Sequence, residues 1–551
     1  MNTYLSFSSL LMLGTVVSGC SREPEAKSES KPNVLFIICD DLNDYNSDLG
    51  GHPDIKTPNI ENFAKTATSF SNAHTNVGLS QPSRNSLFTG IYPHTSKDFG
   101  WTPQYKNSVL QDTRTFLELF REEGYHILGS GKLLHKDVDS LWDEWGVTRR
   151  INYGPHAYNG EKSVGHPSVP EPFRSINIVD GSFAPLSDIP EFPDDETGSN
   201  PPGWTYGPYP FRYVNDDERD LMPDEMHANW AIEKISEMEQ NDNGKPFFLG
   251  VGFVNPHTPL YAPQKYFDMF PLDEIELPKI KEGDLDDSYY RSVFPPEDVG
   301  LHYYDALKKA YGDEEKGLKL FMQAYLACVA FVDEQIGKVI EAVENSKFSN
   351  NTIIILTSDH GWQMGEKEYL YKNSPWEEST RIPLIIKDPR ISEKQQTVHH
   401  PVSLIDIYPT LTDLCGLEGE TKRTDDAPGI EGFSLKPFLE DPGSADWKGP
   451  EGALTLIGSG INKPVEGLGF ISNPSAKWHV ELTRLPEDEY IMKQNYSYRT
   501  KDWRYIMYNN GKEELYDHRI DPYEWNNLAG DENYADVMED LKNQVMDIIE
   551  K

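Results

Sequence analysis

The chain has 551 residues, of which 37% are hydrophobic and 12% aromatic, and its mean hydropathy is -0.61. This composition excludes a disordered chain, which would lack the aromatic residues, and a polytopic membrane protein, which would lack the polarity. The 90 Asp and Glu residues against 51 Lys and Arg give a formal net charge of -39, so the general field repels nucleic acid and anionic lipid. An anionic ligand must therefore meet a local basic pocket.

The N-terminal segment resembles a processing signal. An apolar run at 10–17 is too short to span a bilayer, and it leads into Val-Ser-Gly-Cys at 17–20, which resembles a bacterial lipobox. We expect residues 1–19 to be a signal peptide, Cys20 to carry a lipid anchor to the membrane, and residues 20–31 to form a polar tether. Ordinary cleavage is the alternative, because the signal has no Lys or Arg. Both predict an exported bacterial protein, in the periplasm or as an outer-membrane or cell-surface lipoprotein.

Four short apolar runs each end at polar residues able to do chemistry. The runs are 33–39, 125–129, 247–253 and 353–356. The polar residues that follow are Asp40 and Asp41, Lys132 and His135, Asn255 and His257, and Ser358, Asp359 and His360. Near-continuous apolar runs are typical of parallel strands buried on both faces, and open α/β sheets bind ligands at the carboxyl ends of their strands. The four strand ends therefore predict one convergent site.

Helical patterns fill the gaps between these runs, at 59–68, 113–123 and 317–346. The alternation predicts an α/β fold with a large, mostly parallel sheet flanked by helices. Residues 153–225 are rich in Pro, Gly, Tyr and Asp and have no lasting periodicity. A stretch of that length without regular structure is usually functional or disordered, and we expect it to shape the mouth of the site.

The pattern changes again from about Gly452. Short alternating strands are predicted at 495–499 and 503–508, with a terminal helix at 534–550. We therefore expect a catalytic domain at 32–451 and a smaller C-terminal α+β subdomain at 452–551. The cysteines Cys39, Cys328 and Cys415 are expected to be buried free thiols, because the sequence has no C-x-x-C site and no disulfide framework.

One motif decides the class of protein. Ser80-Gln81-Pro82-Ser83-Arg84, followed by Thr89-Gly90, resembles the signature of type I sulfatases, whose first position is a Cys or Ser oxidised to formylglycine. The residues at the four strand ends stand in that family's order, and the resemblance covers most of residues 32–551. The chain is most similar to the iduronate-2-sulfatase branch, through the segments 131–135, 255–257, 359–362 and 371–374. The resemblance implies an alkaline-phosphatase-like fold and a sulfuric ester hydrolase of the Ser type.

The resemblance also implies how Ser80 would act. A serine sulfate would be a stable dead end, whereas hydrated formylglycine offers one hydroxyl to attack sulfur and a second whose deprotonation expels sulfate. The oxidation requires a formylglycine-generating radical maturase as a partner. Pro82 suits the first turn of a helix, whose N-terminus stabilises an anion. Arg84 is implied to hold the diol and the sulfate, because its planar donors bind oxyanions in a bidentate way.

By the same resemblance, Asp40, Asp41, Asp359 and His360 form a metal site with the oxidised Ser80. Three carboxylates favour a hard cation, Ca²⁺ before Mg²⁺, which would lower the pKa of the diol and neutralise sulfate charge. His360 is an unusual ligand for a hard cation, but the branch that the chain resembles carries His there.

The remaining roles follow the family. Lys132 and Lys372 are implied to stabilise the sulfate oxygens, His135 to take the proton from the second hydroxyl, and His257 to protonate the leaving alcohol. Further candidates for substrate binding are His94, Lys97, Trp101 and Trp362. For these four, core packing or solvent exposure is at least as good an interpretation.

The sequence thus predicts an enzyme that removes O-sulfate from a sulfated saccharide or polysaccharide, and the branch suggests a 2-O-sulfated uronic acid. Two alternatives stay open. One is a phosphomonoester or phosphonate hydrolase of the same fold, although the x-Pro-Ser-Arg run argues against it. The other is a non-catalytic lipoprotein that binds sulfated glycans, if Ser80 is never oxidised.

Overall fold

The structure is a computed structural model that describes Met1 and residues 31–100, 103–135, 139–147, 153–192, 202–207, 209–241, 243–294, 298–458, 491–492 and 494–550. The predicted signal peptide, the anchor position Cys20, nearly all of the tether and Trp101 lie outside the described residues. Residues 32–551 form one compact unit. None of the described helices is long and apolar enough to cross a membrane.

An eight-stranded sheet has the order β18-β2-β17-β15-β1-β13-β4-β5. Its central strands are β1 (Asn33–Asp40), β4 (His126–Gly131), β13 (Phe247–Pro256) and β15 (Thr352–Ser358). They are the four predicted runs, and they are parallel, with β1 between β13 and β15 and with β4 beside β13. The outer strands are β2 (Thr68–Phe70), β5 (Glu144–Trp145), β17 (Leu384–Lys387) and β18 (Gln396–Val398). Only β17 runs antiparallel to its neighbours β15 and β2, so the predicted mostly parallel sheet is confirmed.

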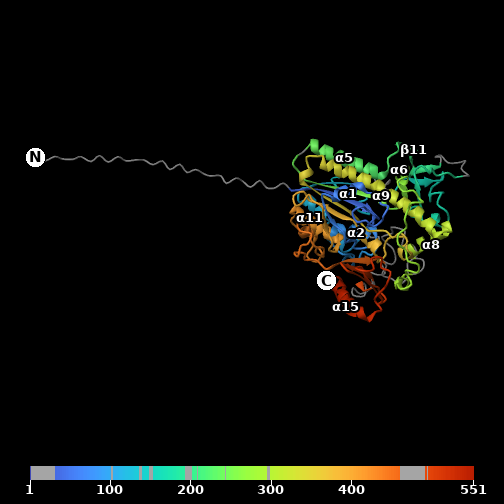
Figure 1. The fold of residues 1–551 in the computed structure, drawn as a ribbon. Helices are drawn as coiled ribbons and strands as arrows, with labels where there is room; N and C mark the ends of the chain where they lie inside the picture. Colours follow the sequence, from blue (N-terminus) through green and yellow to red (C-terminus); the bar gives the residue numbers. More distant parts are fainter. Residues whose placement is uncertain are drawn as a thin grey trace. The chain divides into compact units, whose positions relative to one another are not determined.

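Helices cover both faces of this sheet (Figure 1). On one face lie α1 (Pro58–Ala64), α5 (Pro223–Gln240) and α9 (Glu314–Glu344), and on the other lie α2 (Ser80–Thr89), α4 (Phe116–Glu122) and α11 (Ile407–Cys415). Leu35 and Ile37 of β1 pack in the core that contains α9, whereas Val34 and Phe36 pack in the core that contains α2 and α4. Since both faces of the sheet are buried, neither of the two alternating sets of side chains in β1 faces solvent. This explains why apolar residues follow one another in β1 without interruption.

Shorter elements complete this unit. The helices are α3 (Pro93–Ser96), α6 (Gln264–Phe267), α7 (Tyr290–Val293), α8 (Val299–Tyr311), α10 (Glu377–Thr380) and α12 (Lys436–Glu440). A small three-stranded sheet contains β3 (Ala73–His74), β16 (Arg381–Ile382) and β19 (Val402–Ser403). The three cysteines Cys39, Cys328 and Cys415 are free and buried, as predicted.

The segment 153–225 has more regular structure than its sequence pattern indicated. Strands β6 (His156–Tyr158), β7 (Ser163–Val164), β9 (Gly203–Tyr206) and β10 (Tyr209–Pro210) form an antiparallel sheet, β11 (Tyr213–Asn215) pairs with β12 (Glu218–Arg219), and β8 (Phe183–Pro185) pairs with β14 (Leu260–Ala262). Strands of two to four residues are too short to show a period of two. Through β8 the segment packs beside the stretch that carries His257.

The C-terminal part is a four-stranded antiparallel sheet in the order β20-β21-β22-β23, followed by a helix. Its elements are β20 (Gly452–Ile457), β21 (Asn495–Thr500), β22 (Trp503–Met507), β23 (Glu513–Asp517) and α15 (Ala535–Ile549). Leu541 and Val545 of α15 are buried against this sheet. The smaller α+β element predicted at the C-terminus is confirmed.

Candidate functional site

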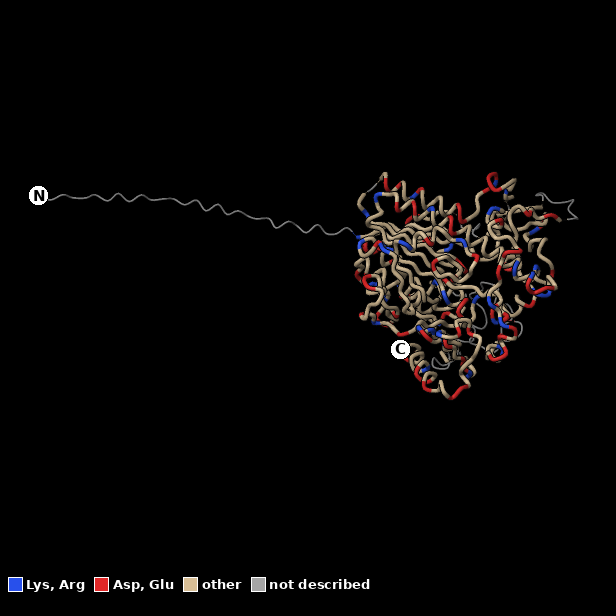
Figure 2. Tube along the Cα trace, viewed as in Figure 1, with Lys and Arg blue, Asp and Glu red and all other residues tan. Residues whose placement is uncertain are grey.

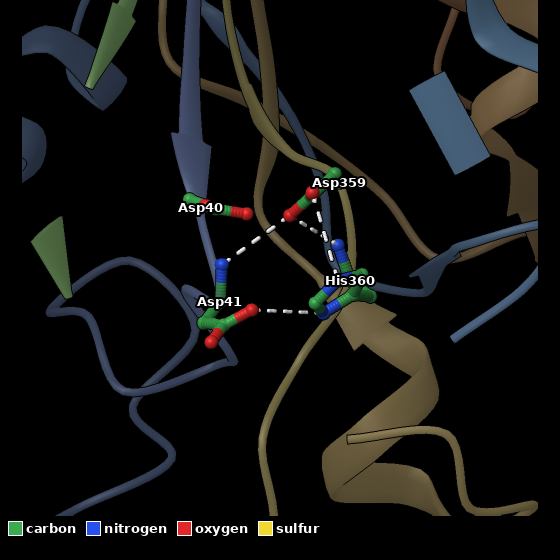
Figure 3. Close-up of side chains that lie close together, drawn as sticks. All are labelled: Asp40, Asp41, Asp359 and His360. Carbon is green, nitrogen blue, oxygen red and sulfur yellow. Dashed lines mark hydrogen bonds and ion pairs between the residues drawn. The ribbon is translucent and has the colours of Figure 1, made fainter. Parts of the chain in front are cut away.

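Four potential metal ligands converge at the carboxyl edge of the large sheet (Figure 3). Asp40 is the last residue of β1, and Asp359 and His360 directly follow β15, the neighbouring parallel strand. Asp41 has a left-handed φ of 64°, and its backbone N–H donates to Asp359 Oδ1 at 3.2 Å. One ligand atom from each of the four residues lies within 4.8 Å of the others, and all four residues are buried.

Ser80 faces this cluster from the first residue of α2. Its side-chain oxygen lies 2.9 Å from His360 Nε2 and 3.3 Å from Asp40 Oδ1. His360 Nδ1 lies 3.1 Å from the carbonyl oxygen of Gly361. That bond assigns the proton to Nδ1, so Nε2 keeps a lone pair directed at Ser80. The predicted nucleophile, Ser80, and the potential metal ligands therefore share one buried space.

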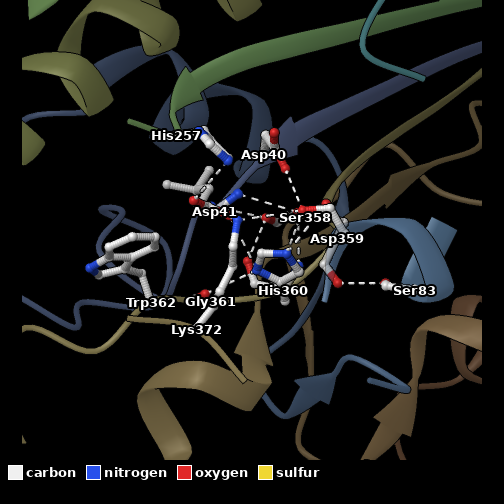
Figure 4. Close-up of polar contacts among 12 residues, drawn as sticks. Asp40, Asp41, Ser83, His257, Ser358, Asp359, His360, Gly361, Trp362 and Lys372 are labelled. Carbon is white, nitrogen blue, oxygen red and sulfur yellow. Dashed lines mark hydrogen bonds and ion pairs between the residues drawn. The ribbon is translucent and has the colours of Figure 1, made fainter. Parts of the chain in front are cut away.

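Three cations surround the carboxylates. Arg84, one turn into α2, donates from Nε to Asp359 Oδ2 at 2.9 Å and from Nη2 to Asp40 Oδ1 at 3.3 Å. Lys132 Nζ pairs with the other oxygen of Asp40. The remaining cation, Lys372, donates to Asp41 Oδ1 at 2.7 Å (Figure 4). Its Nζ lies 3.5 Å from the Ser80 oxygen.

One carboxylate oxygen of this cluster has no donor and could accept a cation. Burial raises the pKa of Asp41 well above its ordinary value despite the Lys372 ammonium, and burial raises the pKa of Asp359 to about 6 despite Arg84. Asp41 Oδ2 is buried and has no hydrogen-bond partner. A buried carboxylate oxygen without a donor is costly unless a cation approaches it. The three carboxylates and the His360 nitrogen thus fit a divalent cation. With that cation bound, the three ionised carboxylates and the three basic residues would give a net charge of about +2, which suits an anionic ligand.

Asp40 behaves differently from the other two carboxylates. Although burial alone would raise its pKa, Lys132 and further basic neighbours hold it well below its ordinary value. Asp40 is therefore ionised throughout the neutral range and provides a fixed negative charge at the end of β1.

Two predicted proton carriers border the site. His257 Nδ1 donates to the carbonyl oxygen of Thr258 at 2.5 Å, which leaves Nε2 free to face Asp41 Oδ2 at 3.7 Å. Burial, followed by the Lys372 charge, lowers the pKa of His257 well below its ordinary value. Burial and the Lys132 charge lower the pKa of His135 in the same way. Both imidazoles are neutral at pH 7 in this state, and a bound anion would favour their protonated forms.

The four further candidates for substrate binding are placed differently. Trp362 is 2% exposed, its ring packs on Tyr371 at 5.0 Å, and Lys372 Nζ lies 5.7 Å from its centroid, so it supports the lysine from within the core. His94 is 3% exposed and stacks on Tyr92. Lys97 ends α3 with a φ of 58° and is half-buried. Trp101 is outside the described part of the chain.

Tyr153 is a site residue that the sequence reasoning missed. Its ring lies 5.1 Å from Lys132 Nζ and 5.2 Å from the His257 ring, at an interplanar angle of 71°. It begins the described portion of the 153–225 segment, where no motif or periodicity marks it. Only the general expectation that this segment shapes the mouth of the site pointed to it.

Comparison with known proteins places these features in a family. The sulfatase family profile matches residues 32–417. The chain is 33% identical to a sulfatase of Formosa agariphila over 97% of this chain and 90% of that protein. It is 27% identical to human iduronate 2-sulfatase over 74% of this chain and 73% of that protein. Among solved structures, a phosphonate monoester hydrolase from Silicibacter pomeroyi has the same fold, with a TM-score of 0.66, 20% identity and coverage of 94% and 95% of the two chains.

Proposed function

Because this chain belongs to the sulfatase family and is a sulfuric ester hydrolase, we propose that it removes O-sulfate from a sulfated saccharide through formylglycine formed at Ser80. The observation that carries the proposal is the position of the Ser80 oxygen, 2.9 Å from His360 Nε2 and within 3.5 Å of Lys372 Nζ. A group at that point meets both the ligand set and the basic residues.

In this proposal the metal ligands and the modified residue 80 have separate roles. Asp40, Asp41, Asp359 and His360 would hold Ca²⁺, which would supply positive charge to the sulfate and favour ionisation of the nucleophile. The hydrated formylglycine supplies the attacking hydroxyl and a second hydroxyl whose deprotonation releases sulfate. In this family, only Ser or Cys at this position can be oxidised to formylglycine.

The chain's own cations and histidines orient and stabilise the substrate. Arg84 is fixed by Asp359 and by the carbonyl oxygen of Leu133, to which Nη1 donates at 3.0 Å, so its fork is preorganised. Lys132 and Lys372 pair with Asp40 and Asp41 in this structure. When the substrate binds, the two ammonium groups move from these carboxylates to the sulfate oxygens. His257 Nε2, which already points toward Asp41, protonates the leaving alcohol, and His135 accepts the proton from the second hydroxyl.

The proposed substrate is a 2-O-sulfated uronic acid in a carbohydrate chain. Its support is the similarity to a protein named iduronate 2-sulfatase over 74% of this chain, together with the resemblance of the segments around Lys132, His257 and Lys372 to that branch of the family. The basic residues are buried in an otherwise acidic molecule, so a sulfate group on a neutral or anionic sugar is held locally.

Phosphonate hydrolysis is not favoured by any observation in this chain. The likeness to a phosphonate monoester hydrolase is at 20% identity and concerns the fold. The sulfated-glycan binding alternative differs from the enzyme only in the oxidation of Ser80, which depends on the maturase. We also propose export, with a lipid anchor at Cys20, as the Val-Ser-Gly-Cys sequence supports.

Two measurements test the proposal. The peptide that contains Ser80, from protein made together with a formylglycine-generating radical maturase, should be lighter than the serine peptide by two hydrogens. The same protein should release sulfate from defined 2-O-sulfated oligosaccharides, whereas protein made without the maturase should fold and be nearly inactive. Full turnover by unmodified protein would refute the role of formylglycine, and release only from other sulfated positions would refute the substrate.

A further inference from the structure

The turn that carries His257 is held from two sides by buried carboxylates. On one side Asp224, in the first turn of α5, accepts two backbone N–H groups near the end of β13 at 2.9 Å each. On the other side Asp180 accepts a hydrogen bond from the hydroxyl of Thr258, the residue after His257. Asp224 thus fixes the backbone of the turn, whereas Asp180 contacts the residue whose carbonyl oxygen orients the imidazole.

Three neutral donors converge on Asp180, which lies in the 153–225 segment shortly before β8. The Thr258 hydroxyl donates to Oδ1, the Tyr303 hydroxyl of α8 donates to Oδ2 at 2.8 Å, and the Asn177 amide donates to Oδ2 at 3.0 Å. Asp180 is 7% exposed and Thr258 is 1% exposed. Since a carboxylate can only accept, the proton of the Thr258 hydroxyl has to point to Asp180.

The direction of that bond decides which atoms His257 faces. A hydroxyl has one proton and two lone pairs, so Thr258 Oγ1, whose proton goes to Asp180, presents lone pairs to its other neighbours. His257 Nδ1 lies 3.4 Å from this oxygen and donates to the Thr258 carbonyl oxygen at 2.5 Å. Two acceptors therefore face Nδ1 and keep its proton there. His257 Nε2 is directed instead toward Asp41 Oδ2, at 3.7 Å (Figure 4).

A proton on Nδ1 is what the proposed role of His257 requires. An imidazolium that gives its Nε2 proton to the leaving alcohol becomes the neutral ring that keeps its proton on Nδ1. The contacts of Thr258 already stabilise this form, so the ring need not turn or change tautomer when the proton is transferred. A positioned proton donor contributes about 10²- to 10⁴-fold to a rate, and that contribution depends on the orientation of the ring.

We propose that Asp180 is a positioning residue for sulfate ester hydrolysis, acting through the Thr258 hydroxyl on the tautomer and orientation of His257. The inference rests on the proposed role of His257 as the proton donor to the leaving alcohol. It gives the 153–225 segment a part in the reaction, at the point where the segment contacts the turn after β13. Tyr303 and Asn177 support the carboxylate and are expected to affect stability.

Variants that keep the shape of the site test this relay. Thr258→Val keeps the branched side chain and removes the hydroxyl, whereas Thr258→Ser keeps the hydroxyl. Tyr303→Phe removes a different donor from the same carboxylate and is the matched control. Each variant is made as the full chain together with a formylglycine-generating radical maturase, and rates are expressed per formylglycine-containing chain. Values of kcat and KM are measured for sulfate esters that range from nitrophenyl to alkyl sulfates.

We expect kcat of Thr258→Val to fall at least about tenfold on alkyl sulfates and less than about threefold on nitrophenyl sulfates, with KM unchanged, because good leaving groups need little protonation. Thr258→Ser should recover the wild-type dependence on the leaving group, and Tyr303→Phe should lose the same factor on every ester. Asp180→Asn should resemble Thr258→Val. The two donors at Oδ2 would hold its amide oxygen, so its amide group would donate to Thr258 and reverse the hydrogen bond.

His257→Ala distinguishes the two ways in which the inference can fail. If His257→Ala loses more activity on alkyl than on nitrophenyl sulfates while Thr258→Val loses the same factor on both, His257 donates the proton without help from Asp180, and the inference is wrong. If His257→Ala itself shows no dependence on the leaving group, the proposed role of His257 is wrong and the inference falls with it. Asp180 and Thr258 test the same relay, so if a variant at one position does not fold, the other position decides.

Discussion

The side-chain oxygen of Ser80 lies 2.9 Å from Nε2 of His360, the ring nitrogen that is left without a proton when Nδ1 donates to the Gly361 carbonyl. The first residue of α2 is thereby joined to the end of β15. The contact brings the motif at 80–84 and the motif at 358–361 together at one place, although nearly three hundred positions separate them in the sequence.

Replacement of Ser80 by Ala should abolish sulfate release while leaving the fold intact. Loss of a nucleophile typically costs at least about 1000-fold in turnover, and Ala is tolerated at the start of a helix. Sulfate release and circular dichroism, measured on maturase-coexpressed protein, check both halves. More than trace activity in a correctly folded Ala variant would remove Ser80 from the mechanism.

Asp359→Asn should weaken cation binding and activity together. The change removes one of three carboxylates in the ligand set and also the ion pair that fixes Arg84 Nε at 2.9 Å. We expect the affinity for Ca²⁺ to fall by at least about tenfold, which corresponds to about 1.4 kcal/mol. Calorimetric titration and sulfate release measure the two effects. Normal affinity together with normal turnover would show that the cation binds elsewhere.

The sequence predicts the strand ends that carry this site better than the residues that surround it. The four runs that end at Asp40, Lys132, His257 and Asp359 could be recognised because strands buried on both faces have no polar positions to interrupt them, and parallel neighbours must end at one edge. The contact between Ser80 and these ends could be predicted only through the family resemblance, since helix α2 has no periodic feature that fixes where it docks.

The residues that surround the site are placed by tertiary contacts, which leave no recognisable pattern in the local sequence. Tyr153 follows no motif, and the strands around it are two to four residues long. An indole suits a sugar ring, so the sequence makes Trp362 a candidate for sugar stacking. The structure instead buries Trp362 against Lys372, and no property of the sequence distinguishes the two roles. Burial of an aromatic residue within a motif is decided by tertiary packing.

Tyr153 should prove to be a positioning residue, and its two substitutions should differ. Tyr153→Phe keeps the ring that contacts His257 and Lys132, so we expect a loss of a few-fold. Tyr153→Ala removes the ring, and the loss should grow with the pKa of the leaving alcohol, because protonation by His257 matters most for poor leaving groups. A series of aryl sulfates measures this slope. An equal loss for every substrate would show that Tyr153 acts through Lys132 alone.

Asp406 should make the stability of the fold depend on pH. It is buried, accepts from the backbone N–H groups of Ser403 and Phe433 at 2.8 Å each, and burial raises its pKa to about 7. Since the folded pKa exceeds the unfolded value of about 3.9, the native state binds more protons between these values, and stability falls as pH rises through this window. The free energy of unfolding of the wild type relative to Asp406→Asn should fall by up to about 1.4 kcal/mol per pH unit between about pH 5 and 7. Urea titrations at several pH values test the slope, and parallel profiles would contradict it.

Salt should act in two directions on kcat/KM. Asp and Glu residues recur along the outer helices and loops (Figure 2), and the net charge of -39 repels an anionic substrate over long range. Because the Debye length is about 8 to 10 Å near physiological ionic strength, moderate salt screens this surface before it weakens contacts with the buried Lys132 and Lys372. We expect kcat/KM on a sulfated oligosaccharide to rise from very low to moderate NaCl and then to fall, with little change in kcat.

Lys132→Ala is the matched variant for this measurement. It should lower activity at every salt concentration and keep the shape of the curve, because it removes a contact inside the pocket and barely alters the total charge. A steady fall of kcat/KM from the lowest salt upward would mean that the substrate approaches over a basic face.

Lys132 directly follows a point at which the backbones of β4 and β13 approach each other unusually closely. Gly131 has a φ of 87°, a Cβ there would lie 1.9 Å from the carbonyl oxygen of Gly252, and a Cβ at Gly252 would lie 2.2 Å from the backbone of Lys132. The Lys132 N–H donates to that same carbonyl at 2.8 Å. The ammonium is thus set by the sheet and not by a loop. For enzyme engineering, this separates two tasks: selection for new sugars can vary Tyr153 and its surroundings, whereas a substitution at either glycine is expected to displace Lys132, the residue that we propose binds sulfate.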